Sequence, residues 1–497
     1  MRILLINSGN DKGISGNANA ESYPPLGIIS LATCLVNEFE NIEVFLRDGQ
    51  VDTLQELKNE IILIRPDIVG ISMYSTSICN TIELAKLAKV AGAITILGND
   101  HAAFHYETIL NKIAEVDYIC IGDVGENTIV DFVYAIMNKI KIEQVPFLAY
   151  RSMNNTICLN KNRKSIRKSQ LFNPKYVLDS IPIPNRNLLP QKYWNHYYES
   201  FVRQKHKSFN PIDYAGITTI NRARGCARKN ISCKYCGIAD LSLRKSSAKI
   251  FWQDVEKSIE EVNASFFYEA FDSATSCPSL IKEWVQAKPN NLDVGFFMYS
   301  QANETNKYIV DIFKKLGVKS VNTGFDSGDN TALKILKSEK DSVEQNKLSA
   351  ALWSEADIEI HTSFVLIGLG NEYKTRKSLD DTLKFAEWLV ENTLTMSLDT
   401  ATLYPDKNSR IGNWLWHPNA AQKESVIYGW DFIDFELLNK LHYKWKNEVY
   451  IDPLEISADF AQMCGTNIDV LLEYDKEIKK LTEKYNLNFG RSQAGPI

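Results

Sequence analysis

The stretch RARGCARKNISCKYCG, residues 222–237, places three cysteines within eleven positions. Cys226, Cys233 and Cys236 have the spacing C-x6-C-x2-C, whereas the other six cysteines lie far apart along the 497 residues. So few cysteines do not make a disulfide scaffold, and in a reducing compartment a tight cluster favours metal ligation over disulfide bonds. Three thiolates suit either a zinc ion with a distant fourth ligand or a 4Fe-4S cluster with one open iron. We therefore expect this stretch to hold a metal centre.

The identity of the metal depends on a fourth ligand. The nearest upstream histidine is His206, and the next one downstream is His361. Structural zinc sites usually collect their ligands from a short loop or hairpin, so zinc here would need a distant residue such as Cys277. The pattern favours the iron–sulfur cluster, and zinc remains the alternative.

Before the cysteines, β-rich runs alternate with helical stretches over residues 1–140. Each run ends in Gly, Asn, Asp or Ser, which are residues suited to turns and helix N-caps. This alternation predicts a doubly wound, flavodoxin- or Rossmann-like parallel sheet whose ligand binds at the carboxyl edge of the strands. The runs are RILLIN (2–7), IEVFLRD (42–48), DIVGISMYS (67–75), AITILGND (93–100) and DYICIGD (117–123).

After the cysteines the same alternation continues over residues 212–412, and it predicts a partial (β/α)6 barrel. We assign residues 141–211 to a small hairpin and an extended linker, and residues 413–497 to a helical C-terminal region. Most of the aromatic residues of that region, including Trp414, Trp416, Trp430 and Trp445, are expected to pack in a core rather than line a substrate pocket. The barrel runs are YAGITTI (214–220), ASFFYEAFD (264–272), VGFFMYS (294–300), VKSVNTGFDSG (318–328), IEIHTSFVLIGLG (358–370) and TMSLDTATLYP (395–405).

The overall composition limits the partners. The chain is 44% hydrophobic and 24% charged with a formal net charge of −5, which gives no electrostatic case for nucleic acid. Its apolar runs are far shorter than the roughly 20 residues that span a bilayer, so we expect no membrane partner. The composition predicts a cytoplasmic protein that acts on a small-molecule or peptide substrate.

The cysteine loop resembles that of the radical S-adenosylmethionine (SAM) superfamily, whose usual pattern is C-x3-C-x-aromatic-C. CKYC, residues 233–236, matches the second half of this pattern, with Tyr235 at the aromatic position that packs near the adenine of SAM in the family. The first half departs, because six residues (ARKNIS, 227–232) stand where the family has three. The resemblance implies that Cys226, Cys233 and Cys236 ligate a 4Fe-4S cluster, and a lengthened loop closes at small entropic cost.

Three further stretches resemble the family's barrel strands in the same order. VNTGFDSGDNTALKILKSEK (321–340) is similar to the fourth-strand pattern and supplies Asp326 and Ser327. HTSFVLIGLGNE (361–372) is similar to the fifth and supplies Glu372, and ATLYPDKNSRI (401–411) resembles the sixth. Each stretch alone contains only the Gly, Ser and acidic residues that are common in turns. Their order after a cysteine loop nevertheless supports the resemblance to the radical SAM superfamily.

After the second barrel strand, the family often presents polar groups to the amino group of SAM. AFDSATS (270–276) fills this place, with Asp272 and Ser273 as the candidates. The alternative for Asp272 is an N-cap of the following helix.

YPPLGIISLATCL (23–35) resembles the N-terminal region of radical SAM enzymes that carry a cobalamin-binding domain. PDIVGISMYSTS (66–77), ILGNDHAAFHYETIL (96–110) and VDYICIGDVGENTI (116–129) resemble later parts of that domain. The loop after the first strand lacks a G-x-G-x-x-G run, so a dinucleotide site is poorly supported. The resemblance implies cobalamin contacts at Ser72, Tyr74, Ser75, Gly98, Asn99 and His101.

The Asp-x-His-x-x-Gly element that supplies a cobalt-binding histidine in many cobalamin proteins is absent. RDGQVD (47–52) stands near its expected place without a histidine. This implies cobalt without a histidine from that motif. For His101, the alternative to cobalt ligation is a loop hydrogen bond or a helix cap.

Together these resemblances imply a cobalamin-dependent radical SAM enzyme that uses a 4Fe-4S cluster, SAM and cobalamin, with a flavodoxin or ferredoxin as the electron donor. The reaction implied is methyl transfer to an unactivated carbon. One alternative is an enzyme of the same type that performs cyclisation, rearrangement or oxidation. A second is a non-catalytic cobalamin- or metal-binding regulator whose cluster loop is spoiled by the extra residues.

Overall fold

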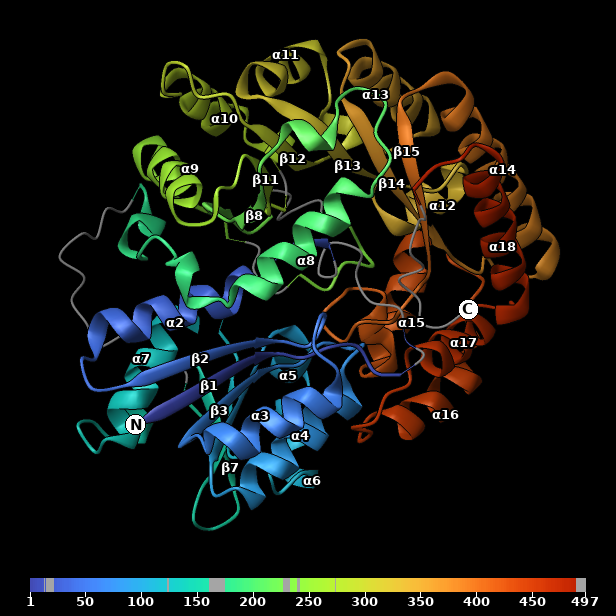
Figure 1. Cartoon of the computed structure of the whole chain (residues 1–497). Coiled ribbons are helices and arrows are strands. Elements are labelled where there is room, and N and C mark those ends of the chain that lie inside the picture. Colours follow the sequence, from blue (N-terminus) through green and yellow to red (C-terminus); the bar gives the residue numbers. More distant parts are fainter. Residues whose placement is uncertain are drawn as a thin grey trace.

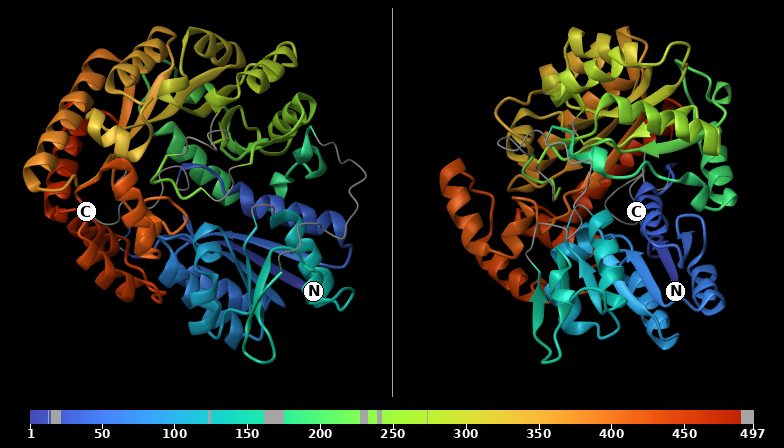
Figure 2. Two further views of the ribbon diagram at one scale, coloured as in Figure 1. Left: turned by 180° about the vertical axis from the view of Figure 1, so that it is seen from behind. Right: turned by 90° about the vertical axis from the view of Figure 1, so that its left-hand side faces the viewer.

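The computed structural model describes residues 1–12, 14, 22–122, 125–160, 175–226, 233–238, 242–272 and 274–488. Two sheets lie one above the other, and helices α15 to α18 run along one side of both (Figure 1). The two turned views in Figure 2 show the same arrangement, with the strands of the first half of the chain below those of the second half. None of the helices in the described ranges is long and apolar enough to cross a membrane.

The first sheet has seven strands in the order β2-β1-β3-β4-β5-β6-β7. The pairs from β2 to β5 are parallel, and the hairpin β6–β7 adds two antiparallel strands at one edge. All five predicted strands are therefore confirmed as a doubly wound sheet. The strands are β1 Arg2–Asn7, β2 Glu43–Asp48, β3 Ile68–Ser72, β4 Ile94–Gly98, β5 Tyr118–Cys120, β6 Leu148–Arg151 and β7 Ile157–Leu159.

The alternation of side chains along β1 assigns the two faces of this sheet. Ile3 and Leu5 pack with α2 (Leu26–Glu38) and α7 (Gly125–Ile136), whereas Leu4 and Ile6 pack on the opposite face. Successive side chains of a strand point to opposite faces, so a continuous apolar run is buried on both sides. The opposite face is covered by α3 Leu54–Ile64, α4 Ile78–Val90, α5 Asp100–Phe104 and α6 Tyr106–Lys112.

The segment between the two sheets includes a helix that its sequence does not reveal. Instead of an extended linker, it contains the helix α8, Gln191–Val202. The Tyr197 hydroxyl donates to Asp48 at the end of β2 over 2.5 Å, and the Tyr193 hydroxyl donates to Asp52. These hydrogen bonds fix α8 to the carboxyl end of β2, at the RDGQVD stretch (47–52), which contains no histidine.

The second sheet has six parallel strands in the order β15-β14-β13-β12-β11-β8, as the sequence predicts for a partial barrel. Its strands are β8 Ile217–Ile220, β11 Phe266–Glu269, β12 Gly295–Ser300, β13 Val318–Asp326, β14 Glu359–Leu366 and β15 Thr395–Thr402. Its helices are α9 Ala248–Val262, α10 Pro278–Gln286, α11 Lys307–Leu316, α12 Asn330–Leu336, α13 Val343–Glu355 and α14 Glu372–Asn392.

The YPPLG segment docks the first domain into the barrel. The Tyr23 ring lies 4.6 Å from the ring of Tyr268 and 5.8 Å from that of Phe297, both on barrel strands. The Thr219 hydroxyl donates to the carbonyl of Pro24 over 2.8 Å. This segment therefore brings the carboxyl edges of the two sheets together.

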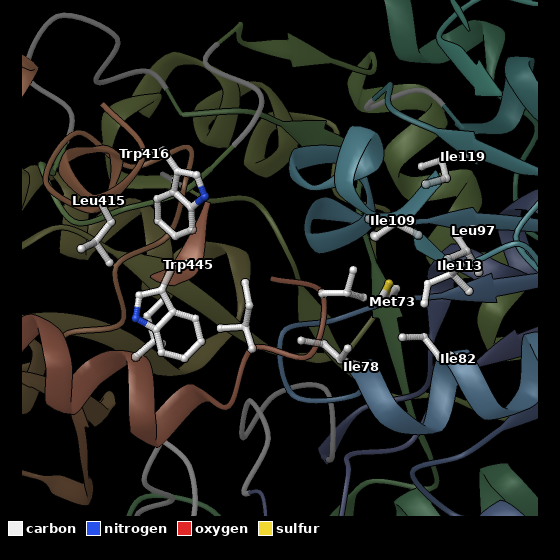
Figure 3. Close-up of a cluster of buried hydrophobic side chains, with 14 of the residues drawn as sticks. Met73, Ile78, Ile82, Leu97, Ile109, Ile113, Ile119, Leu415, Trp416 and Trp445 are labelled. Atoms are coloured by element: carbon white, nitrogen blue, oxygen red, sulfur yellow. The ribbon is translucent and has the colours of Figure 1, made fainter. Parts of the chain in front are cut away.

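The C-terminal helices share a hydrophobic core with the first domain. Buried Trp416 and Trp445 belong to the same cluster as Met73 and Ile78, as Figure 3 shows. Trp414 is buried there as well, so these tryptophans serve packing. The helices are α15 Pro418–Tyr428, α16 Phe435–Trp445, α17 Pro453–Met463 and α18 Ile468–Lys484.

A buried carboxylate joins the linker to the start of the barrel. Asp254 on α9 binds Arg186 over 2.8 Å and Arg222 over 2.7 Å. Burial acts to raise the pKa of Asp254, but the two guanidinium groups hold this pKa below its ordinary value. The carboxylate therefore stays charged and neutralises two arginines that are almost inaccessible to solvent.

We expect Asp254→Ala to lower the free energy of unfolding by about 3–5 kcal/mol, because two buried guanidinium groups lose their counter-ion. Urea denaturation at neutral pH measures the change, with the exposed Asp311→Ala as the control. A loss as small as that of the control would show that these arginines do not depend on Asp254.

Candidate functional site

A cavity of about 530 Å³ lies between the carboxyl edges of the two sheets. Ser72, Gly98 and Asn99 line it from the first sheet, and Asn221 and Asp272 line it from the barrel. The ends of parallel strands are the usual ligand site of both sheet types. The structure therefore joins two predicted ligand edges into one site. Further lining residues include Ser30, Cys120, Gly122, Glu126, Thr128, Thr219, Arg224, Gly225, Arg244 and Ala270.

Some of the predicted contact residues lie outside this lining. The Tyr74 hydroxyl donates to Asn7 over 3.1 Å, and burial raises the pKa of Tyr74 to about 12. Ser75 is half-buried beyond the lining. Ser273 lies outside the described residues.

His101 faces the C-terminal region rather than the cavity. Its ring stacks on His105 with 4.6 Å between centroids, and His105 packs edge-on against Trp416 at 5.7 Å. Burial lowers the pKa of His101 to about 4, so the imidazole is neutral at physiological pH. This arrangement gives His101 a packing role in the interface between the two regions.

The depressed pKa of His101 predicts a loss of stability in acid. The unfolded state binds the proton near pH 6.5 and the folded state only near pH 4, so stability is complete above pH 6.5 and falls towards pH 4. Between pH 7 and pH 5 this one group costs about 2 kcal/mol. We expect His101→Gln to reduce the loss by that amount in urea denaturation at the two pH values. An unchanged pH dependence, equal to that of the exposed control His417→Gln, would contradict this assignment.

The cysteine loop leaves the barrel after β8 and is closed by a short ladder. The strands β9 (Ala223–Arg224) and β10 (Arg244–Lys245) pair antiparallel on either side of it. The inserted residues 227–232 lie outside the described part of the chain, as do residues 239–241. The ladder therefore fixes the place where the loop begins, directly before the first cysteine.

The three thiols are close enough to influence one another. Burial raises the pKa of Cys236 to about 12, and the proximity of Cys233 and Cys226 acts in the same direction. In the part of the chain that the structure describes, no group of three or more His, Cys, Asp or Glu side chains is arranged to hold a single metal ion. The donor set of the loop is nonetheless three cysteine thiols, none of which is in a disulfide bond, and thiolates are the ligands that iron–sulfur clusters take.

The second half of the loop is fastened to the barrel rim. The amide of Lys234 donates to Leu336 over 2.7 Å, and the carbonyl of Lys234 accepts from the amide of Ile411 over 2.8 Å. The Asn408 amide donates to the carbonyl of Gly237 over 3.2 Å. A Cβ atom on Gly237 would lie 2.3 Å from the Asp406 carboxyl carbon, so any larger residue there would have to displace the Asp406 side chain. Segments 334–337 and 406–411 thus hold Cys233 and Cys236 in place.

Asp326 supports the cysteine loop through Tyr235. The Tyr235 hydroxyl donates to Asp326 over 2.9 Å, and Asp326 also pairs with buried Lys337 over 2.6 Å. Asp326 sits at the end of β13 with a positive φ of 60°, a conformation that tight tertiary contacts must maintain. This ion pair thus fixes the aromatic side chain between the two cysteines.

The other two barrel candidates lie away from the cavity. The Ser327 hydroxyl is buried against Thr382 at 3.0 Å. Glu372 begins α14 on the surface and pairs with Arg376 over 2.8 Å. Neither residue belongs to the cavity lining.

Sequence reasoning missed an ion pair that crosses between the domains. Arg224 binds Glu126 through both nitrogens of its fork, at 2.6 and 3.2 Å, and the Ser30 hydroxyl donates to Glu126 over 3.0 Å. Burial acts to raise the pKa of Glu126, but Arg224 lowers it to about 2, so the carboxylate is charged. Glu126 ends the sequence GDVGE (122–126), and Arg224 lies two residues before Cys226; these positions were the only sequence signals for the two residues.

Comparison with known families divides the chain into the same two domains as the structure. The B12 binding domain family matches residues 17–133, and the Radical SAM superfamily matches residues 220–405. These ranges correspond to the first sheet and to the partial barrel.

Relatives and a solved structure extend this match across most of the chain. An uncharacterized methyltransferase of Pyrococcus horikoshii is 24% identical over 86% of this chain and 85% of its own length. The anaerobic magnesium-protoporphyrin IX monomethyl ester cyclase of Cereibacter sphaeroides is 24% identical over 78% of this chain, which spans 60% of the length of that protein. The radical SAM methyltransferase TsrM from Kitasatospora setae has the same fold, with a TM-score of 0.60 and 15% identity over 84% of this chain and 75% of its own.

The cavity suits the cofactors of these two families. A Cβ atom on Gly98 would meet nothing within 4 Å, so the strand edge leaves room for a flat ring. The side-chain oxygen of Asn221 is buried in the wall and has no hydrogen-bond partner among the described residues. The amide groups on the rim of a corrin are donors that match such an oxygen.

The two halves of the site thus have distinct tasks. The B12-binding domain binds cobalamin, and the radical SAM domain binds SAM together with a 4Fe-4S cluster. The chain belongs to the radical SAM enzymes that carry a B12-binding domain.

Proposed function

We propose that this enzyme transfers a methyl group from SAM to an unactivated carbon of a small-molecule or peptide substrate. The observation that supports the proposal is a cavity lined by residues of both domains, among them Gly98 at the edge of the first sheet and Gly225 and Asp272 beside the cysteine loop. Cobalamin supplies a cobalt that carries methyl groups, and the cluster with SAM supplies the radical that removes a substrate hydrogen.

The residues of this chain have separate roles in the proposal. Cys226, Cys233 and Cys236 hold the cluster at the barrel mouth. Asp272 lines the cavity, and its carboxylate accepts from the amide of Gly225 over 3.3 Å. This contact places an anionic group beside the start of the cysteine loop, where it can bind the amino group of SAM.

In this proposal the first sheet binds cobalamin. Ser72 and Gly98 end the adjacent strands β3 and β4, Asn99 follows directly as the N-cap of α5, and all three residues line the cavity. Asn99 has a positive φ of 79°, which turns the chain away from the strand edge and keeps the space open. We assign these three residues to the corrin face.

Two relatives' names favour different reactions. The Pyrococcus protein is named as a methyltransferase, whereas the Cereibacter protein is named as a cyclase. Ring closure, rearrangement or oxidation is therefore the second candidate. A methyltransferase converts part of its SAM to S-adenosylhomocysteine, and the second candidate does not.

The test measures both products of SAM by mass spectrometry. The reconstituted enzyme is incubated anaerobically with cobalamin, a reductant, an extract of small molecules and peptides, and SAM with or without a deuterated methyl group. We expect 5′-deoxyadenosine, S-adenosylhomocysteine and a product that carries the label. 5′-Deoxyadenosine alone, without S-adenosylhomocysteine or labelled product, would favour the second candidate.

Each reductive cleavage of SAM consumes one electron. We assign its delivery to a flavodoxin or ferredoxin, the donor class implied by a low-potential cluster. Three of the nine cysteines form a tight cluster, a pattern typical of metal ligation in a reducing compartment, which supports the cytoplasm as the location.

A further inference from the structure

We propose that the Glu126–Arg224 ion pair positions the cysteine loop against the cobalamin-binding domain, and so couples the two halves of the reaction. The inference rests on the proposed function, because it concerns the step that needs both domains. Glu126 is the second residue of α7 in the first domain, and Arg224 ends β9 in the barrel. The pair therefore crosses the wall of the shared cavity.

The geometry of the pair is strict. A guanidinium fork that meets both carboxylate oxygens fixes the direction as well as the distance of its partner. Glu126 is only 5% exposed, and the Ser30 hydroxyl on α2 gives its carboxylate an additional donor. Ser30 and Glu126 thus come from two helices of the first domain, α2 and α7. Arg224, which binds the carboxylate of Glu126, belongs to the barrel.

The chain connects this pair to one cysteine in particular. Cys226 follows Arg224 by two residues, and the intervening Gly225 has a positive φ of 88° and donates to Asp272. The anchors on the barrel rim hold Lys234 and Gly237, and six residues separate Cys226 from Cys233. The position of Cys226 within the barrel is therefore set by the β9–β10 ladder, and Arg224 sets the place of that ladder relative to the first domain.

A buried ion pair contributes little net stability, because desolvation of the two charges offsets their attraction. The ion pair instead fixes how the segments that carry Glu126 and Arg224 are oriented relative to each other. Arg224 and Glu126 are thus positioning residues, and their loss should change the relation between the two domains more than the chemistry of either one.

The test compares wild-type enzyme with Glu126→Gln, Arg224→Gln, the double variant and Arg224→Lys. Each protein is reconstituted with iron, sulfide and cobalamin, and the rates of S-adenosylhomocysteine and 5′-deoxyadenosine formation are measured together. Iron content, cobalamin affinity and hydrogen exchange of the amides in 222–226 are recorded for the same samples.

We expect both Gln variants to lower the rate of S-adenosylhomocysteine formation by about tenfold or more, with 5′-deoxyadenosine formation within about threefold of wild type. The double variant should lose no more than the single ones, because the pair acts as a unit. Arg224→Lys keeps the charge without the fork and should recover part of the rate. Faster exchange in 222–226 should accompany the loss.

Other outcomes would overturn the inference in recognisable ways. A parallel fall of both rates would mean a general structural role. A weakened affinity for cobalamin in Glu126→Gln would mean that Glu126 contacts the cofactor directly. Wild-type rates in all variants would mean that the ion pair positions nothing. If wild-type enzyme itself formed no S-adenosylhomocysteine, the proposed methyl transfer would fail instead, and hydrogen exchange and iron content would still report on the ion pair.

Discussion

Replacement of Cys233 or Cys236 by alanine is expected to reduce 5′-deoxyadenosine formation by at least about 100-fold, since a cluster held by three thiolates loses a direct ligand. The two cysteines flank Lys234 and Tyr235, which are fastened to the rim of the barrel by the amide of Lys234 and the hydroxyl of Tyr235. The backbone there should keep its place, so the effect reports on the thiol. Iron counting and product quantification after anaerobic reconstitution measure it.

The Cys226→Ala variant tests whether Cys226, at the start of the lengthened half of the loop, also ligates the cluster. We expect the same loss, because a cluster held by three thiolates loses a direct ligand whichever of the three cysteines is replaced. The control is Cys79→Ala, which removes an exposed thiol in the first domain. Full iron content and activity in Cys226→Ala would show that a different residue supplies the third ligand.

Filling the cavity from the first sheet should weaken cobalamin binding and spare the cluster. In Gly98→Phe the new side chain starts at a position where a Cβ atom meets open space, and it projects from a wall of the cavity. Aromatic residues are favourable in strands, so the substitution should not disturb β4. We expect cobalamin affinity to fall at least about tenfold because the ring occupies volume that the corrin needs.

Gly98→Ala is the matched control, since a methyl group fills little of the cavity. Cobalamin absorbance after gel filtration gives the bound fraction, and iron content with thermal unfolding shows whether the rest of the protein is intact. Wild-type cobalamin affinity in Gly98→Phe would place the cofactor somewhere other than the carboxyl edge of the first sheet.

The strands of both sheets were predictable because each is a compact apolar run that ends in turn-forming residues. Helix α8 was not, since QKYWNHYYESFV has few aliphatic residues to reveal a helical stripe. Its buried face consists of Tyr193, Trp194, Tyr197 and Phe201, spaced three and four residues apart, and is fixed by hydrogen bonds to Asp48 and Asp52. Aromatic spacing of this kind is the signal that could have identified it.

The residues of the site divide in a similar way. Ser72, Gly98, Asn99 and Asp272 line the cavity because residues at the ends of parallel strands face the ligand edge whatever their neighbours are. His101 lies one turn further on, where packing against the C-terminal region decides its direction. The partner of Arg224 is 98 residues away in sequence, and no local pattern reveals such a pairing.

The most direct test of the whole account is electron paramagnetic resonance of the anaerobically reconstituted and reduced protein, with and without SAM, in the presence of cobalamin. The account predicts about four irons per chain, bound cobalamin in the same molecule, and a cluster signal that changes when SAM is added. Zinc in place of iron, or a cluster signal that ignores SAM, would contradict it.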